Sequence, residues 1–283
     1  PQAADAVQAG TVECSHTAAF YYVGKDPAWA FGTCIPFGMN FRQHNAWWKE
    51  GGGEKVFNDW LRGQNMRYIL SGNTGAQMGG WFRTEVNTPD DVKGLKMRIP
   101  GLGGRLWAAM GAVPQQIAGG DIYPALERGT IDATEWVGPY DDEKLGFYKV
   151  APNYYFPGWW EGGPMLVAMI NLDKWNALPK YYQHVLEQAG HLANNWMMAR
   201  YDQANPVALK KLLAVGTKLR PFPSAVMEAS FKAAKELHAE VAAGNANFKK
   251  VYDSLTSFSN NGYQWFQVAE VGYDNFMARH SQV

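Results

Sequence analysis

The sequence predicts an α/β fold, because short apolar runs alternate with amphipathic segments along much of its 283 residues. Residues 66–71 form an apolar run that ends at a Gly-Asn turn, and residues 95–99 form a second run that ends at Pro100. Both patterns are typical of buried strands. Further strands are expected at residues 113–117, 131–137 and 165–171. Strands that alternate with helices at this spacing favour a parallel sheet covered on both faces.

The helices are placed by their first and last residues. One is expected at residues 104–110, because Gly111 can end it in a left-handed conformation, and another at residues 122–128. Pro179 opens a longer helix with a 3.6-residue apolar period, which Pro206 is expected to bend or break. Its roughly 25 residues would span about 40 Å, which is long enough to tie two domains together.

The C-terminal region, residues 246–283, is expected to form amphipathic segments that break at residues 260–262, Asn-Asn-Gly. Many large aromatic residues lie here, beyond the last strand–helix unit. Two outcomes stay open: the segments pack back on their own chain, or two subunits exchange a terminal helix pair.

Composition restricts the possible partners. Hydrophobic residues make up 47% of the chain and charged residues 18%, and the length predicts one large or two medium domains. No apolar run reaches the roughly 18 residues that predict a membrane span. Lys plus Arg and Asp plus Glu both number 26, so no net charge attracts a nucleic acid or an acidic membrane.

The aromatic content is high, with 12 Trp, 14 Tyr and 14 Phe. Most of these rings are expected in the core. The runs at residues 154–156 and 159–160, however, lie among Pro and Gly rather than on a periodic face. Rings in such a place favour a ligand cleft.

The two cysteines, Cys14 and Cys34, exclude a disulfide framework and a zinc site built mainly from thiolates. A single bridge and two free thiols both stay open. Residues 3–10 have the pattern of a helix end that runs directly into a strand at residues 11–17, with no earlier element to pair with. We therefore expect that residues are missing upstream.

Arg98 lies at the end of the strand predicted at residues 95–99, where ligands collect in open α/β sheets. Its planar guanidinium can bind a carboxylate through two parallel hydrogen bonds. A surface ion pair is the more common fate of a single arginine of this kind.

Glu135 and Glu161 stand beside bulky rings, since Glu135 precedes Trp136 and Glu161 follows Trp159 and Trp160. An ionised carboxylate in such surroundings must be paired, hydrogen-bonded or bound to a metal. Two interpretations stay open: an oxygen-rich site for a hard cation such as Na⁺ or Ca²⁺, and an acid–base pair of the glycosidase kind.

Sequence motifs of catalysis are absent. The six histidines show no metal spacing and no serine partner, and the chain has no G-x-S-x-G, H-E-x-x-H or Walker sequence. The glycine-rich run at residues 101–104 precedes a helix but lacks the third glycine of a dinucleotide fingerprint at the proper spacing. A binding protein needs none of these motifs.

The run at residues 91–100, Asp-Val-Lys-Gly-Leu-Lys-Met-Arg-Ile-Pro, resembles the DctP-type substrate-binding proteins of TRAP transporters, the tripartite ATP-independent periplasmic systems. The resemblance covers essentially the whole chain, is densest from residue 66 to 170, and continues through residues 111–114, 122–133 and 135–140. Two further runs are similar to the subgroup that binds 2-oxoacids or lactate with a metal cation: residues 134–139, Thr-Glu-Trp-Val-Gly-Pro, and 157–161, Pro-Gly-Trp-Trp-Glu.

This resemblance implies a role for each candidate residue. Arg98 would hold the substrate carboxylate, and Gln77 would contact both the substrate and the cation. The shell of the Na⁺ or Ca²⁺ ion would be completed by Glu135, the backbone carbonyl of Trp136, and Glu161. Two further residues are expected near the ligand from the first domain, Asn73 and Tyr22.

The resemblance also implies a periplasmic-binding-protein-like clamp of two lobes, with mixed β-sheets and a long connecting helix. Lobe I is expected to comprise residues 1–74 and 164–204, without its usual N-terminal start, and lobe II residues 75–163 and 205–245. Apart from the resemblance, the many aromatic residues of the helical extension at residues 246–283 favour a homodimer formed through these C-terminal helices. The clamp would close, in the periplasm, on a small 2-oxo or 2-hydroxy monocarboxylate of the pyruvate, 2-oxobutyrate and lactate class, and deliver it to the membrane permease.

Two other functions stay open at this point. The chain would be an enzyme if Glu135 and Glu161 acted as acid and base on a small carboxylate or a sugar. It would be a ligand-sensing module if a signalling partner used the same pocket. The absence of catalytic motifs favours a binding protein over an enzyme.

Overall fold

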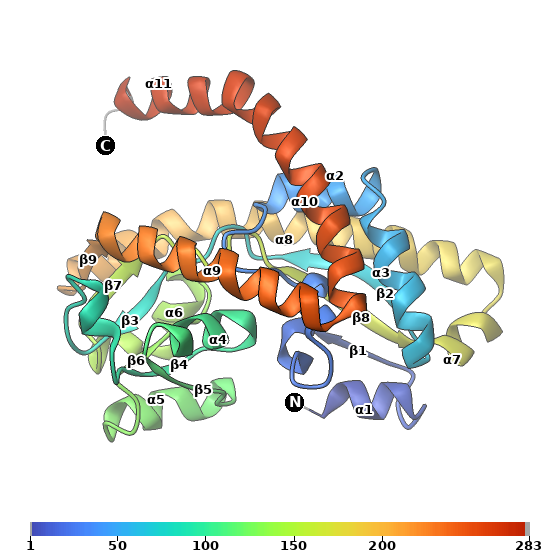
Figure 1. Cartoon of the computed structure of the whole chain (residues 1–283), viewed down its shortest axis with the longest axis horizontal. Coiled ribbons are helices and arrows are strands. Elements are labelled where there is room, and N and C mark those ends of the chain that lie inside the picture. The colour runs from blue at the N-terminus through green and yellow to red at the C-terminus, as the bar shows by residue number, and fades with distance from the viewer. Residues whose placement is uncertain (1, 281–283) are drawn as a thin grey trace.

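The computed structural model describes residues 2–280, which fold around two β-sheets (Figure 1). The first sheet is antiparallel, in the order β1 (Cys14–Thr17), β8 (Met165–Asn171) and β2 (Met66–Asn73). The second sheet has six strands in the order β5-β4-β6-β3-β7-β9. Its strands are β3 (Gly80–Phe82), β4 (Lys96–Arg98), β5 (Val113–Gln115), β6 (Ala133–Thr134), β7 (Asn153–Phe156) and β9 (Lys218–Pro221).

The α/β class with mixed sheets is confirmed, but the expectation of a parallel sheet is wrong for the first sheet and holds only for part of the second. In the second sheet β4 is parallel to β5 and β6, and β7 is parallel to β9. β3 is antiparallel to both of its neighbours, β6 and β7. The chain crosses between the sheets more than once, so β8 returns to lie between β1 and β2 from a distant part of the sequence.

The helices and short turns lie around these sheets, and most begin or end within a few residues of the positions expected from the sequence. The helices are α1 (Ala3–Gln8), α2 (Phe41–Lys49), α3 (Gly53–Leu61), α4 (Gly101–Ala109), α5 (Gly119–Glu127), α6 (Pro139–Leu145), α7 (Leu172–Ala177), α8 (Lys180–Ala214), α9 (Ser224–Gly244), α10 (Ala246–Phe266) and α11 (Gly272–His280). The 3-10 turns are η1 (Ala19–Tyr22), η2 (Pro27–Gly32), η3 (Arg62–Gln64), η4 (Pro89–Val92) and η5 (Phe147–Lys149), and η6 (Gln267–Val271) is a π-helical turn.

α8 runs along the back of the molecule and packs against β2 of the first sheet and α6 beside the second (Figure 1). It has 35 residues and continues through Pro206, so the expected break is wrong. Proline removes one backbone donor from the helix. Packing on both sides of this position holds the helix together, and the adjacent Asn205 side chain accepts a hydrogen bond from the Tyr140 amide at 3.0 Å. The expected link between two parts of the fold is present.

α9 and α10 form a second connection between the two sheets. α9 packs on α4 beside the second sheet, and α10 packs on α2, α3 and η2 beside the first. The expected break at residues 260–262 is wrong, because α10 continues to Phe266 before the π-helical turn. Beyond that turn α11 projects away from the body (Figure 1).

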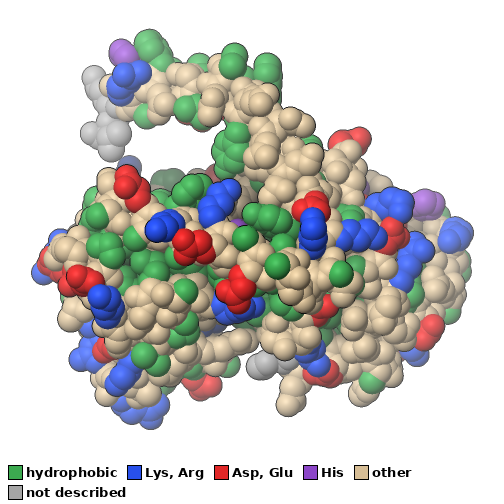
Figure 2. All heavy atoms as spheres, viewed as in Figure 1, with side chains coloured by type: hydrophobic (Ala, Val, Ile, Leu, Met, Phe, Trp, Pro, Cys, Tyr) green, Lys and Arg blue, Asp and Glu red, His purple; other side chains and the backbone are tan. Residues whose placement is uncertain are grey.

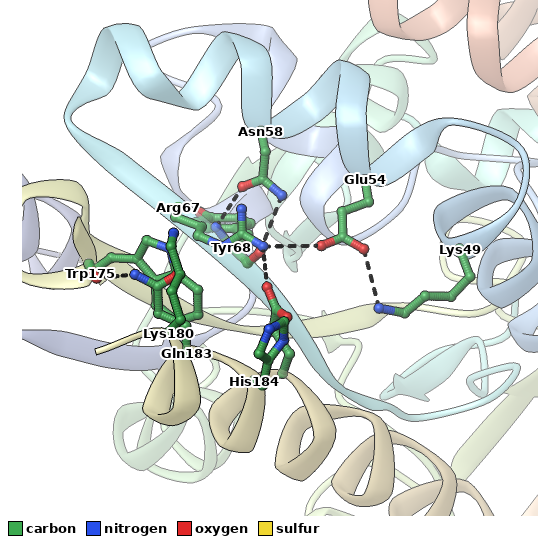
Figure 3. A network of polar contacts seen from close by, with 10 residues as sticks. Lys49, Glu54, Asn58, Arg67, Tyr68, Trp175, Lys180, Gln183 and His184 are labelled. Carbon is green, nitrogen blue, oxygen red and sulfur yellow. Dashed lines mark hydrogen bonds and ion pairs between the residues drawn. The ribbon is translucent and has the colours of Figure 1, made fainter. Parts of the chain in front are cut away.

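The edge of the first sheet is covered by side chains from α3 and α8 (Figure 3). On the edge strand β2, the amide of Asn58 donates to the Tyr68 carbonyl at 3.2 Å and accepts from the Tyr68 N–H at 2.8 Å. Arg67 on the same strand pairs with Glu187 of α8 at 2.6 Å and lies 3.6 Å from Glu54 of α3. The two Asn58 bonds satisfy backbone groups that an open sheet edge would leave free, and the ion pairs of Arg67 cover the same edge.

Most of the aromatic rings are in the core, as the sequence indicated. The larger core joins the first sheet to α4, α9 and α10, and a smaller one around Trp81, Ile122 and Tyr154 lies beside the second sheet.

The two cysteines are both free: Cys14 is exposed, and the buried Cys34 thiol donates to the Trp160 carbonyl at 3.5 Å. The first sheet carries an apolar hollow of about 450 Å³, bounded by β1, β2, β8 and α8. Among the helices of residues 2–280, none is long and apolar enough to cross a membrane.

We predict that acid destabilises the fold through His44, a buried residue of α2. Its Nδ1 lies 2.7 Å from the Gly163 carbonyl and its Nε2 has no hydrogen-bond partner among the described residues. Burial lowers the pKa of His44 to about 4. The unfolded chain, with an ordinary histidine pKa of about 6.5, therefore binds the proton first, and stability is lost as pH falls through this window.

Urea unfolding at pH 7 and pH 4.5 checks this prediction. The free energy of unfolding should fall between the two values, and His44→Gln should reduce that fall by about 2–3 kcal/mol. His184→Gln, at an exposed histidine of α8, is the matched control and should leave the fall unchanged. Equal falls in the wild type and His44→Gln would contradict the assignment.

Candidate functional site

A cavity of about 110 Å³ lies between the two sheets and collects most of the residues singled out in the sequence. One wall carries Gln77, Arg98, Glu135, Trp136 and Glu161, all from the part of the chain that builds the second sheet. The opposite wall is mainly apolar and aromatic and comes from η1, β8 and α8. It contains Phe20, Tyr21, Leu166, Met197 and Tyr201.

Arg98 is the last residue of β4 and its side chain is only 2% exposed. One terminal nitrogen forms an ion pair with Glu135, and Nε donates to the Ile117 carbonyl at 3.1 Å. The guanidinium also lies over the Trp136 ring, 5.2 Å from its centroid. The ion pair of Arg98 is therefore buried at the carboxyl end of a strand, unlike the surface pair that is the more common fate of a single arginine.

The two carboxylates, Glu135 and Glu161, are 2% and 3% exposed. Burial raises the pKa of Glu135, although the Arg98 charge opposes the shift. Burial and then the Glu135 charge raise the pKa of Glu161 well above its ordinary value. The two carboxyl groups lie close enough for each to influence the pKa of the other. Two buried acids, of which only Glu135 is paired with Arg98, favour either a shared proton or a bound cation.

Gln77 brings a neutral oxygen to the same place. Its Nε2 donates to Thr74 Oγ1 at 3.2 Å, whereas its Oε1 is buried and has no hydrogen-bond partner among the described residues. Its backbone is held on both sides, because its N–H donates to the Glu161 carbonyl at 3.0 Å and its carbonyl accepts from the Gly158 N–H at 2.8 Å. A Cβ at position 158 would lie 2.7 Å from the Gln77 carbonyl oxygen, so only glycine permits this approach.

The donor set fits a hard cation. Two carboxylates, the unpartnered amide oxygen of Gln77 and the backbone carbonyl of Trp136 are all oxygen ligands, which Na⁺ and Ca²⁺ accept. No hydrogen bond to the Trp136 carbonyl is found within residues 2–280. The same part of the chain holds no cluster of three or more His, Cys, Asp or Glu side chains that could bind a metal, so the fit depends on the two neutral oxygens.

Two expected residues lie elsewhere than expected. Tyr22 points into the core, where its ring meets that of Trp29 edge-on at 5.5 Å, and the preceding Tyr21 lines the cavity instead. Asn73 does not line the cavity. Its side chain donates to the Gly163 carbonyl at 3.0 Å and accepts from the Gly75 N–H at 2.8 Å, which fixes the loop that carries Gln77.

Several residues that line the cavity were not predicted from the sequence. Thr74 adjoins Asn73 and could have been found from the position of β2. Met197 and Tyr201 lie four residues apart on the inward face of α8, where nothing in the pattern separates a ligand wall from a core.

A second hollow of about 220 Å³ adjoins the first and shares Tyr21 and Arg98 with it. Its other walls come from the segment before α5. The Gln116 side chain donates to the Tyr21 carbonyl at 3.4 Å, and the Phe37 N–H donates to the Trp159 carbonyl at 2.7 Å. These bonds link η1 and the turn before α2 to the segments that follow β5 and β7, so parts of the chain beside both sheets enclose the cavity.

Two α/β halves that enclose a polar cavity, with an arginine at a strand end, define a solute-binding protein of the clamp type. Residues 1–245 match the family of bacterial extracellular solute-binding proteins, family 7, named DctP. The chain belongs to this family.

Individual relatives agree with this assignment. The chain is 50% identical over 275 residues, which are 97% of this chain and 76% of the relative, to a monocarboxylate 2-oxoacid-binding periplasmic protein of Nostoc sp.. A TRAP transporter solute-binding protein from Bordetella bronchiseptica superimposes with a TM-score of 0.97 at 48% identity, covering 99% of this chain and 84% of that one. That structure is a mixed-occupancy dimer with calcium and picolinate in one site and an apo second site.

A third relative binds a smaller ligand. The TRAP periplasmic solute-binding protein from Pseudoalteromonas atlantica contains sodium and pyruvate, with a TM-score of 0.93 at 39% identity, covering 97% of this chain and 84% of that one. The family confirms the expected extracytoplasmic localisation and the expectation of a binding protein rather than an enzyme. The acid–base alternative for Glu135 and Glu161 is therefore not retained.

Proposed function

We propose that the chain captures a small 2-oxo or 2-hydroxy monocarboxylate together with Na⁺ or Ca²⁺ and delivers it to the membrane permease of a TRAP transporter. The observation that carries this proposal is the buried cluster of Arg98, Glu135 and Glu161. With both acids ionised the cluster has a net charge of −1, which burial opposes. A cation offsets this charge, and a bound Ca²⁺ with one substrate carboxylate leaves the site neutral.

Roles for the residues follow from the geometry. Arg98 binds the substrate carboxylate through the nitrogen that neither Glu135 nor Ile117 occupies. Gln77 contacts both substrate and cation through its free Oε1. Glu135, the Trp136 carbonyl and Glu161 complete the cation shell. In place of Tyr22 we assign Tyr21 to the substrate, and Asn73 supports the Gln77 loop.

The size of the cavity favours a substrate of three or four carbon atoms. A volume of about 110 Å³ holds only a small molecule, and the wall opposite the charges is formed by the apolar side chains of Phe20, Leu166 and Met197. An apolar wall accepts a methyl or ethyl group and disfavours a second carboxylate. Pyruvate in the Pseudoalteromonas protein and the 2-oxoacid specificity of the Nostoc protein support this class.

For the clamp we propose the boundaries expected from the sequence: residues 1–74 and 164–204 as lobe I, and residues 75–163 and 205–245 as lobe II. The charged residues then lie in lobe II and the apolar wall in lobe I. Closure removes water from the charged groups and strengthens their interaction with the ligand. A hinge-closing receptor of this kind presents its closed form to the permease.

We also propose that two copies form a homodimer through residues 246–283. Large apolar side chains are exposed along the end of α10, the π-helical turn and α11 (Figure 2). They are Tyr263, Trp265, Val268, Val271, Tyr273, Phe276 and Met277. A second copy that covers these side chains would remove them from water. The Bordetella relative is also a dimer, which supports a dimeric state.

The function is tested by thermal shift and calorimetry with pyruvate, 2-oxobutyrate and lactate, and with succinate as the comparison. We expect stoichiometric binding without turnover, and a rise in melting temperature of about 5 °C at a ligand concentration of 100 times the Kd. The rise should disappear after chelation of Ca²⁺ in a buffer whose sodium is replaced by potassium. Adding back CaCl₂ or NaCl should restore it, but not in Glu161→Gln. A rise in melting temperature that is the same with and without Ca²⁺ and Na⁺ would contradict the cation site.

Arg98→Ala should raise the Kd for the carboxylate about 100-fold, corresponding to about 3 kcal/mol, because a charged hydrogen-bond partner is lost inside the cavity. Arg105→Ala is the matched control, since Arg105 of α4 is partly exposed and 3.7 Å from Glu240 at the surface. Titration calorimetry at saturating CaCl₂ measures both. Unchanged affinity of a folded Arg98→Ala protein would remove the assigned role.

Val268→Asp should convert the dimer to a monomer, because Val268 is 78% exposed in the single chain and a charge there would oppose burial of the apolar C-terminal segment in an interface. Val113→Asp, at an exposed valine of β5, is the control. Light scattering after size exclusion gives the mass. A wild-type protein that is monomeric at micromolar concentration would refute the assembly and leave the binding function untouched.

A further inference from the structure

We propose that Asp142 is a positioning residue of the cation site: its buried carboxylate holds the Glu135–Val137 segment so that the Trp136 carbonyl faces the cavity. This inference rests on the proposed function, since it concerns the same cation site. Asp142 belongs to α6 and does not itself line the cavity.

The Asp142 carboxylate is fully buried and accepts hydrogen bonds on both oxygens. Oδ2 accepts from Trp81 Nε1 at 2.9 Å and from the Tyr154 hydroxyl at 2.7 Å. Oδ1 accepts from the backbone N–H of Val137 at 3.2 Å. Two of the three donors are N–H groups, which cannot reverse their direction. Such a set fits an ionised carboxylate and no other side chain of similar size.

The bond to Val137 is one of three that fix the segment on either side of Trp136. The Glu135 N–H donates to the Arg98 carbonyl at 3.2 Å, and the Val137 carbonyl accepts from the Met78 N–H at 3.0 Å. With the Val137 N–H held by Asp142, no hydrogen bond within residues 2–280 holds the Trp136 carbonyl away from the cavity.

The Trp136 ring restricts the segment further. It lies between the Arg98 guanidinium and Gly119, where an added Cβ would approach the ring to 2.5 Å. The ring therefore fixes the side chain of this residue, and the flanking backbone bonds fix its carbonyl. Asp142 supplies the bond on the C-terminal side.

The negative charge of Asp142 also lies close enough to Glu135 for the two carboxylates to interact. Burial raises the pKa of Asp142 itself to about 7. The carboxylate is thus mostly ionised at pH 8, the pH chosen for the test. A second negative layer behind Glu135 and Glu161 increases the attraction for a cation.

The neighbouring acids of α6 do not share this environment. Asp141 accepts from the Tyr201 hydroxyl at 2.5 Å and lies 3.7 Å from Lys144, and Glu143 pairs with Lys211 at 3.3 Å. Both pairs are partly exposed. Glu143→Gln therefore changes the charge of the same helix without touching the buried carboxylate.

The test measures the Kd of Ca²⁺ at pH 8 on the full chain, by calorimetry, for the wild type, Asp142→Asn, Tyr154→Phe and Glu143→Gln. Asp142→Asn should raise the Kd about 10- to 100-fold, the range typical of groups that orient metal ligands. Its amide oxygen cannot accept from both N–H donors in the present geometry, and its charge is lost. Tyr154→Phe removes one donor but keeps the carboxylate and its bond to Val137, so its Kd should stay near that of the wild type.

Melting temperatures separate positioning from stability. Asp142→Asn and Tyr154→Phe should both melt below the wild type, since each loses a buried hydrogen bond, but only Asp142→Asn should lose cation affinity. Equal Ca²⁺ affinity of Asp142→Asn and the wild type would overturn the inference and leave the proposed function intact. A wild type that binds neither Ca²⁺ nor Na⁺ would instead refute the proposed function.

A measurement on the wild type alone covers the case in which Asp142→Asn fails to fold. Hydrogen exchange followed by NMR reports the Val137 amide directly. Slow exchange in the cation-free protein is expected, because the bond to Asp142 exists before the cation binds. Fast exchange of this amide, beside slow exchange in β4 and β7, would overturn the positioning role.

Discussion

The burial of Arg98, Glu135 and Glu161 in one small cavity is the constraint on which the rest of the structure depends. Removing such groups from water costs several kcal/mol each unless partners replace the water. The fold supplies partners from separate places: the end of β4, the segment after β6 and the loop between β7 and β8. Because β4 and β6 are parallel neighbours, Arg98 and Glu135 leave the sheet at the same edge. The cluster therefore exists only when the second sheet is assembled.

The polar and the apolar residues that line the cavity come from different parts of the fold. The residues that carry charge or donate oxygen lie within residues 75–163, whereas Phe20, Leu166 and Met197 present an apolar surface from the other half. In the proposed function the polar groups are arranged before closure, and the apolar wall excludes water afterwards. Side chains that are already ordered lose less conformational entropy when the ligand binds. Exclusion of water strengthens each electrostatic contact.

The sequence was sufficient for the α/β class, most helix and strand positions and the placement of Arg98, because each follows from local pattern or from strand-end geometry. It could not separate Tyr21 from Tyr22, since successive side chains of a 3-10 turn point about 120° apart and only packing decides which faces the cavity. It also misjudged Pro206, where the buried Ala204 and Ala208 pack α8 on either side of the proline, and residues 260–262, through which α10 continues. The roles of Gln77, Glu135 and Glu161 came from family resemblance, and the geometry adds the free Oε1 of Gln77.

Asp141 and Asp142 show why a site of this kind extends beyond the residues that line it. They are adjacent in the sequence, and nothing in the local pattern distinguishes them. The helix places them about 100° apart, so Asp141 stays partly exposed and Asp142 enters the core. The buried one meets Trp81 and Tyr154, whose rings stack at 3.9 Å, and reaches the Val137 N–H beside the cavity. An aromatic core and a cation site thus share one carboxylate, which means that packing of the second sheet and the direction of the Trp136 carbonyl are set by the same group.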